Sequence, residues 1–212
     1  MKKKNYINIT KDWLNNRDNE IIVEESNYYE SNGIKYYVDN KNVILDYSKK
    51  ELEVAIWLTK IFGYKVKLLP RINVPEGIKT ADYLFKDELW DLKEINGYSK
   101  YSFGHAVEGK KKQANNFIFD ITKSKLSKKD IYVQLNLLFA SKHTSCISKV
   151  IIKDNKKLLG VYKKEMTSVQ EHQDHLINYD YTIIFKLCQI FSWLLKELYG
   201  IFSKTQIEWF DR

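Results

Sequence analysis

KTADYLFKDELWDLKEI, residues 79–95, is the stretch of sequence on which the predicted fold depends. It contains two short apolar-rich runs, 81–85 and 89–95, with a polar turn at residues 86–88 between them. Alternating runs of this length around a turn are typical of a β-hairpin. The sequence therefore predicts two paired strands here, around which the other elements are arranged.

Three charged residues of this hairpin form a candidate catalytic group. Asp91 and Lys93 are two positions apart in the second run, so their side chains face the same side of the sheet. Asp82 lies early in the first strand and comes opposite them if the register permits. Two carboxylates and a lysine on one face can hold Mg²⁺ or Mn²⁺ and place an ammonium group beside an attacking water, a chemistry that suits phosphodiester hydrolysis.

The same residues have a plainer interpretation, because a D-x-K triplet on an exposed strand is merely a solvated charge pair. The apolar neighbours Trp90 and Leu92 favour a hairpin that is largely buried, where an unpaired carboxylate is costly. On pattern alone both interpretations stay open.

Residues 48–62 are predicted to form the clearest helix in the first half of the chain. Ser48 and Glu51 have the spacing of a capping box, and Gly63 can take the left-handed conformation that ends a helix. Apolar side chains recur at helical spacing, at Val54, Ala55, Leu58, Ile61 and Phe62. Glu51 heads this apolar face, so its role is either that of a cap or that of an active-site carboxylate.

The remaining elements alternate between strand and helix patterns. Before the hairpin we expect a helix at 9–15 and strands at 21–24, 35–38 and 65–70. After it we expect a mobile polar loop at 96–106 and a strand at 116–121. A helix at 127–142 and a second hairpin at 149–153 and 158–162 follow. This order predicts an α/β (α+β) fold with a mixed central sheet flanked by helices. It divides the chain into an N-terminal α/β extension (1–46), a core (47–165) and a helical C-terminal segment (166–212).

The composition favours a polyanionic partner. The 212-residue chain has a formal net charge of +8 and a pI near 9.2, which indicates nucleic acid or an anionic membrane surface. Only three of its 35 basic residues are arginine, so bidentate reading of bases should be scarce, and A/T-rich codons are a second explanation for the excess of lysine. Four tyrosines are interpreted as half-buried strand residues, with a base-stacking platform as the alternative: Tyr28, Tyr29, Tyr36 and Tyr37.

The sequence predicts neither export nor a membrane span. The two cysteines have no metal-ligand spacing and no disulfide framework, and the polar N-terminus lacks the pattern of a signal peptide, so we expect a cytoplasmic site of action. Residues 181–202 are strongly apolar, but polar residues recur in them every three or four positions, at Lys186, Gln189, Ser192 and Lys196. This pattern predicts an amphipathic helix that docks on the core or forms a homodimer.

The chain resembles the PD-(D/E)xK nuclease superfamily, whose core carries the pattern E…D…(D/E)xK. The matching residues, in order, are Glu51 on its helix, Asp82, and Asp91-Leu92-Lys93. Over residues 37–164 the chain resembles more closely the C-terminal tRNase domain of contact-dependent growth-inhibition toxins and of related phage or mobile-element proteins. The motifs that carry this resemblance are ELEVAIWL at 51–58, the run 75–82, WDLKEI at 90–95 and KKKQANNFIFDI at 110–121. Two departures are Ala81 in place of the proline before Asp82, and Asn115-Asn116 where an acidic residue often follows Q-A.

The resemblance implies a restriction-endonuclease-like core, a bound Mg²⁺ or Mn²⁺ and a role for each matching residue. Asp82 and Asp91 would ligate the metal, with the carbonyl of Leu92 as a further oxygen ligand, and Glu51 would complete the outer metal shell. Lys93 would orient or activate the water. Two further groups would contact the scissile phosphate: Gln113, and Lys110 or Lys112.

The predicted function is that of a metal-dependent ribonuclease that acts on tRNA as a toxin or conflict effector, for which an immunity protein is a candidate partner. The alternative is a DNA endonuclease of restriction, repair or junction-resolving type on the same core. A second alternative, from a different class, is a non-catalytic nucleic-acid-binding module. The complete set of three carboxylates and a lysine speaks against the last, since clustered carboxylates near a phosphate do not help binding.

Overall fold

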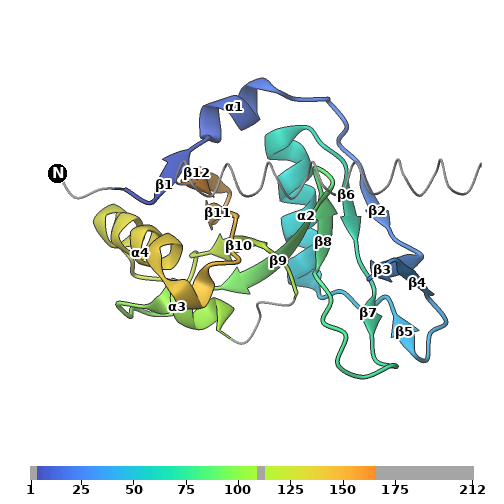
Figure 1. Cartoon of the computed structure of the whole chain (residues 1–212). Coiled ribbons are helices and arrows are strands. Elements are labelled where there is room, and N and C mark those ends of the chain that lie inside the picture. Colours follow the sequence, from blue (N-terminus) through green and yellow to red (C-terminus); the bar gives the residue numbers. More distant parts are fainter. Residues whose placement is uncertain (1–3, 109–112, 166–212) are drawn as a thin grey trace, which may run out of the picture. The chain divides into compact units, whose positions relative to one another are not determined.

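The computed structural model describes residues 4–108 and 113–165 (Figure 1). The predicted C-terminal helix at 181–202 and the candidate phosphate ligands Lys110 and Lys112 lie outside the described residues. None of the helices in the described part is long and apolar enough to cross a bilayer.

A mixed sheet of eight strands forms the centre of the fold (Figure 1). In spatial order its strands are β1 (Tyr6–Asn8), β12 (Lys157–Lys164), β11 (Lys149–Asp154), β10 (Asn116–Asp120), β9 (Glu88–Glu94), β8 (Tyr83–Phe85), β6 (Val66–Leu68) and β2 (Val23–Glu25). The pairs β11–β10, β10–β9 and β6–β2 are parallel, and the other neighbours are antiparallel. The predicted α/β class with a mixed central sheet is confirmed.

Smaller elements complete the described part of the chain. Two short antiparallel sheets pair β3 (Tyr28–Ser31) with β4 (Ile34–Tyr37), and β5 (Val43–Ile44) with β7 (Arg71–Ile72). The helices are α1 (Thr10–Asn15), α2 (Lys49–Phe62), α3 (Ser102–Val107), α4 (Lys128–Ala140) and the 3₁₀ turn η1 (Lys142–Thr144). The proposed division at residue 46 stays a prediction; strands from both sides of it, β1 and β2 among them, belong to the eight-stranded sheet.

The two faces of the central sheet contribute to different apolar cores. Along β10, Phe117 and Phe119 belong to the core beneath α3 and α4, whereas Ile118 between them belongs to the core beneath α2. This alternation follows from the two-residue period of a strand. Trp90 of β9 is fully buried in the core beneath α2, so its neighbour Asp91 faces the side of α3 and α4.

The predicted hairpin at 79–95 is confirmed as β8 and β9. Tyr83 pairs with Trp90 in antiparallel register, and the two turn residues, Lys86 and Asp87, have φ of 52° and 58°. Two consecutive positive φ values match the two-residue turn whose twist suits a hairpin. The backbone N–H of Asp82 donates to the carbonyl of Trp90 at 3.1 Å, so the residue just before β8 is also held against β9.

The predicted helix at 48–62 is confirmed as α2, including both of its ends. Ser48 Oγ accepts from the N–H of Glu51 at 3.1 Å, while the Glu51 carboxylate accepts from the N–H of Ser48. Gly63 ends the helix with φ of +70°.

The predicted mobile loop at 96–106 is wrong in its second half, where the chain forms α3. Phe103 and Val107 are buried on the core beneath this helix, and the N–H of Phe103 donates to Gln134 of α4 at 3.0 Å. The six-residue helix is therefore stabilised by partners 31 residues away, which local sequence does not reveal.

Candidate active site

Asp82, which is half-buried, and Asp91, which is buried, form an acidic pair at the β8–β9 hairpin. The two carboxyl groups lie close enough to interact, and the side chain of Asp91 is only 1% exposed. Asp82 Oδ2 accepts a 2.6 Å hydrogen bond from the N–H of Leu92, which fixes its carboxylate against β9. Lys93 Nζ forms an ion pair with Asp91 Oδ2. The structure thus brings together three of the predicted site residues.

The surroundings of Asp82 favour its protonated form. Burial is the largest cause that raises the pKa of Asp82, to about 8, and the charges of Asp91 and Glu51 act in the same direction. The hydrogen bond from Leu92 lowers the pKa but does not offset burial. Apart from its ion pair with Lys93, Asp91 Oδ2 accepts no hydrogen bond. One lysine therefore faces two closely placed carboxyl groups.

Glu51 lies near the pair but does not join it as a third ligand. Its carboxylate accepts the N–H of Ser48 within the capping box, and its backbone carbonyl accepts a 3.1 Å hydrogen bond from Tyr83 Oη. Among residues 4–108 and 113–165, no three His, Cys, Asp or Glu side chains converge as a metal-binding group. Glu51 acts here as a cap whose charge still raises the pKa of Asp82.

Gln113 reaches the same corner of the fold from the segment that precedes β10. Its Nε2 donates to the carbonyl of Thr80 at 3.2 Å, two residues before Asp82. Its Oε1 is buried, and no group of residues 4–108 or 113–165 donates a hydrogen bond to it. Gln113 therefore offers a free acceptor near the acidic pair.

The residues that are present fit a divalent cation. Buried acceptor oxygens without donors are rare in folded proteins, and Gln113 Oε1 has none among the described residues, while Asp91 Oδ2 has only the ammonium group of Lys93. Carboxylate and carbonyl oxygens are the ligands that Mg²⁺ and Mn²⁺ prefer. The N–H of Leu92 points towards Asp82, and the carbonyl of a strand residue lies on the same edge as its N–H, so the Leu92 carbonyl is available on that side.

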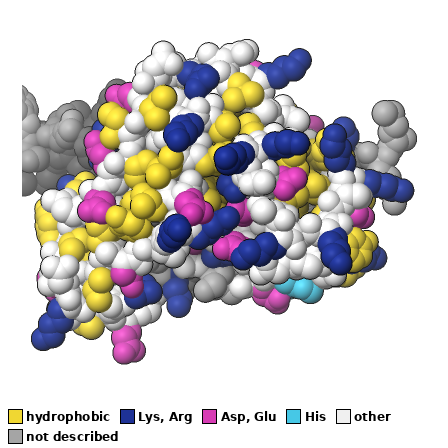
Figure 2. All heavy atoms as spheres, turned by 180° about the vertical axis from the view of Figure 1, so that it is seen from behind, with side chains coloured by type: hydrophobic (Ala, Val, Ile, Leu, Met, Phe, Trp, Pro, Cys, Tyr) yellow, Lys and Arg dark blue, Asp and Glu magenta, His cyan; other side chains and the backbone are white. Residues whose placement is uncertain are grey.

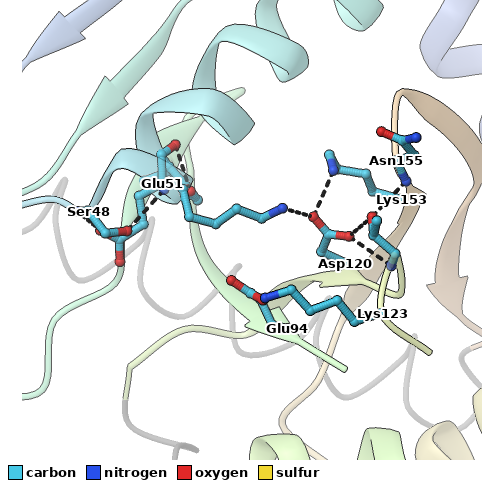
Figure 3. A network of polar contacts seen from close by, with 10 residues as sticks. Ser48, Glu51, Glu94, Asp120, Lys123, Lys153 and Asn155 are labelled. Atoms are coloured by element: carbon cyan, nitrogen blue, oxygen red, sulfur yellow. Dashed lines mark hydrogen bonds and ion pairs between the residues drawn. The ribbon is translucent and has the colours of Figure 1, made fainter. Parts of the chain in front are cut away.

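A second polar network fixes the start of α2 and can be followed in Figure 3. Asp120, at the end of β10, is paired with Lys50 of α2 at 2.6 Å and with Lys153 of β11 at 2.7 Å. Burial acts to raise the pKa of Asp120, but hydrogen bonds from Lys153, Lys50 and Thr122 outweigh it and hold this pKa well below its usual range. The network ties α2, and with it Glu51, to the central sheet.

Tyr29 is a residue of this site that the sequence did not reveal. It comes from β3, is 4% exposed, and its Oη accepts from the N–H of Ala81 at 3.3 Å. Burial raises its pKa, the bond from Ala81 lowers it, and the charges of Asp91 and Asp82 raise it further. In the sequence, Tyr29 was only one of four neighbouring tyrosines. That pattern does not show which residue its side chain will contact.

The fold and site together describe a mixed α/β protein with an acidic pair and a lysine on one hairpin. Residues 79–158, from this hairpin to the start of β12, match the family model described as the contact-dependent growth inhibition CdiA C-terminal domain. No curated protein matches the chain. A solved structure, the CdiA-CT/CdiI toxin and immunity complex from Burkholderia pseudomallei, is similar to it at 21% sequence identity and a TM-score of 0.42, over 55% of this chain and 83% of that one.

Proposed function

We propose that this protein is a divalent-metal-dependent ribonuclease that acts on tRNA as a growth-inhibition toxin. The observation that carries the proposal is the acidic pair of Asp82 and Asp91 with Lys93 on one face of the β8–β9 hairpin. The order Glu51, Asp82, Asp91, Lys93 supports a PD-(D/E)xK core of restriction-endonuclease type. The family match over residues 79–158 supports the assignment to growth inhibition.

Each residue has a role that follows from its position. Asp82, Asp91 and the carbonyl of Leu92 would hold the metal, which supplies Lewis acidity and a bound water of lowered pKa. The ammonium group of Lys93 lies against Asp91 Oδ2, where it would orient the water and stabilise charge on the phosphate. Glu51 would act through its charge from the outer shell, as its carboxylate is held by the cap.

Lysine side chains would supply the grip on the nucleic acid. Figure 2 shows Lys and Arg side chains spread over one face of the molecule, with acidic and apolar side chains between them. We assign Gln113, with Lys110 or Lys112, to the scissile phosphate, because Gln113 lies beside Thr80 at the acidic pair. Few arginines and many lysines suit binding to the phosphate backbone rather than reading of bases.

An immunity protein is the partner we propose for this toxin. A nuclease that acts on cellular RNA has to be blocked in the cell that makes it, and the matched family is described as one of growth inhibition. The Burkholderia pseudomallei structure contains a toxin together with an immunity protein.

The test combines substrate choice with two substitutions. Wild-type protein should cleave tRNA in Mg²⁺ or Mn²⁺ and be inactive in EDTA. Asp91→Ala should abolish Mn²⁺ binding in calorimetry and also cleavage, because it deletes a ligand. Lys93→Ala should still bind Mn²⁺ but lose on the order of a hundredfold in single-turnover rate, as for one positioned electrostatic group.

Glu94→Ala is the matched control, since it removes a carboxylate of the same strand whose partner is the surface residue Lys123. It should retain full activity. Full activity of wild type in EDTA, or a wild-type rate for Asp91→Ala, would rule the mechanism out. Cleavage of duplex DNA but not of RNA would keep the site and establish the DNA endonuclease instead.

A further inference from the structure

A cavity of about 590 Å³ opens between α3 and α4, away from the acidic pair. Its walls include an aromatic ring, two imidazoles, a lysine, a carboxylate and apolar side chains: Tyr101, His105, His143, Lys100, Glu108 and Leu138. Its volume lies within the usual range for small-ligand sites, about 300–1,000 Å³. None of the roles assigned above uses these residues.

The cavity is held open by contacts of its own walls. The side chain of Gln134, 3% exposed, donates from Nε2 to the carbonyl of Ser99 at 3.1 Å and accepts the N–H of Phe103 at 3.0 Å. These two bonds hold both ends of the 99–103 segment against α4. The walls are therefore positioned before any ligand arrives, which reduces the ordering cost of binding.

The chemistry of the walls suits a nucleobase that carries a neighbouring phosphate. Tyr101 is 49% exposed, so part of its ring is accessible to a stacking partner, and the ring of His105 lies 6.2 Å from it. Lys100 Nζ lies 5.4 Å from the centre of the Tyr101 ring, where it can meet a phosphate. RNA-binding proteins recognise unpaired bases by stacking on aromatic side chains over an apolar floor.

The cavity lies on the same face of the sheet as the candidate catalytic residues. The ring of Phe103 in α3 stacks on that of Phe119 in β10 at 4.4 Å, and Phe119 is the strand neighbour of Lys93. α3 also carries the cavity residues Gly104 and His105, so the cavity and Lys93 lie on the same side of the sheet. One bound RNA strand can therefore reach both places.

We propose that this cavity receives an unpaired nucleobase of the RNA substrate, a few nucleotides from the scissile phosphate. The inference rests on the proposed function and adds a substrate subsite to it. The stacked base contributes affinity and places the strand, while the acidic pair and Lys93 act on the phosphate.

The first variant, Tyr101→Ala, removes the stacking ring from a half-exposed position. The probe is a fluorescein-labelled single-stranded RNA of mixed sequence, and its binding to the full chain is measured by anisotropy in EDTA, without cleavage. Loss of one stacked base, about 1–3 kcal/mol, corresponds to a Kd increase of roughly five- to a hundredfold. Tyr101→Phe keeps the ring and should bind as wild type. Tyr98→Ala removes a tyrosine, 64% exposed, that does not line the cavity, and should also leave affinity unchanged.

The second variant, Gly104→Leu, fills the cavity without disturbing the fold. A Cβ added at Gly104, within α3, meets no atom within 4 Å, and leucine is the better helix former. Its melting temperature should equal or exceed that of wild type, while its RNA affinity should fall as far as that of Tyr101→Ala.

The outcomes separate this inference from the proposed function. Wild-type RNA affinity in both Tyr101→Ala and Gly104→Leu, with wild-type cleavage of tRNA, would overturn the cavity as a base subsite and leave the ribonuclease intact. A wild type that neither binds nor cleaves RNA would overturn both.

Discussion

The surroundings of Asp82 raise the pKa of its carboxyl group well above that of an ordinary aspartate. The ordinary pKa of an aspartate is 3.8, and burial beside Asp91 raises that of Asp82 to about 8. Between about pH 4 and pH 8 the metal-free folded protein therefore binds a proton that the unfolded chain does not. This contribution to stability is fully present below about pH 4 and is lost as the pH rises through about 8.

The first prediction follows from this sign. In EDTA, the free energy of unfolding of wild type relative to Asp82→Asn should fall as the pH rises, with a slope of at most about 1.4 kcal/mol per pH unit between about pH 5 and pH 8. The measurement is urea unfolding at several pH values. Saturating Mg²⁺ should remove the slope, because the cation favours the ionised carboxylate. Parallel pH profiles for the two proteins in EDTA would contradict the assignment.

At the scale of elements, α2 is positioned by its first turn rather than by its apolar stripe alone. Lys50 and Glu51 are adjacent, yet one is paired with Asp120 across the sheet and the other closes the capping box. Lys153 is 6% exposed and shares Asp120. A buried charge that loses its partner is costly, so this network is sensitive to a change at Asp120.

The second prediction is that Asp120→Asn destabilises the protein by about 3–5 kcal/mol, because Lys153 is left buried beside a neutral amide. Lys123→Ala is the control: it breaks the exposed pair with Glu94 and should cost under about 1 kcal/mol. Urea unfolding of both variants is the measurement. A loss at Asp120→Asn as small as that at Lys123→Ala would mean that the network does not anchor α2.

At the scale of the whole molecule, the first and last strands of the described chain pair with each other at one edge of the central sheet. β1 pairs with β12, Tyr6 opposite Lys164, and α1 leads on from β1 across the same end of the sheet (Figure 1). Tyr6 is buried, with its ring edge-on to Tyr162 at 5.5 Å and 6.2 Å from Phe139 of α4. The N-terminal segment is thus part of the core beneath α4.

The third prediction compares neighbouring residues of β1. Tyr6→Ala should destabilise the protein by about 3–5 kcal/mol, as for removal of a large buried aromatic side chain. Ile7→Ala, at a position that is 49% exposed, should change stability by no more than about 0.5 kcal/mol. Thermal unfolding of both proteins tests this, and equal melting temperatures would show that the N-terminal strand is dispensable.

Local pattern was sufficient for the elements whose signals lie within a few residues. The hairpin of β8 and β9 follows from two apolar runs around a turn, and α2 follows from its capping box and terminal glycine. The same two-residue period places Asp91 and Lys93 on one face, which is why the centre of the candidate site could be predicted.

Tertiary structure decided everything that depends on partners far apart in the chain. The pairing of β1 with β12, the formation of α3 against Gln134 and the contact of Tyr29 with Ala81 join segments from 31 to more than 150 residues apart, and strand register carries no local signal. Glu51 shows the difference at one residue. The sequence determined both its cap spacing and its place before an apolar stripe. Only the folded chain decided between the two roles, because the Glu51 carboxylate accepts the N–H of Ser48, whereas Asp82 and Asp91 interact directly with each other.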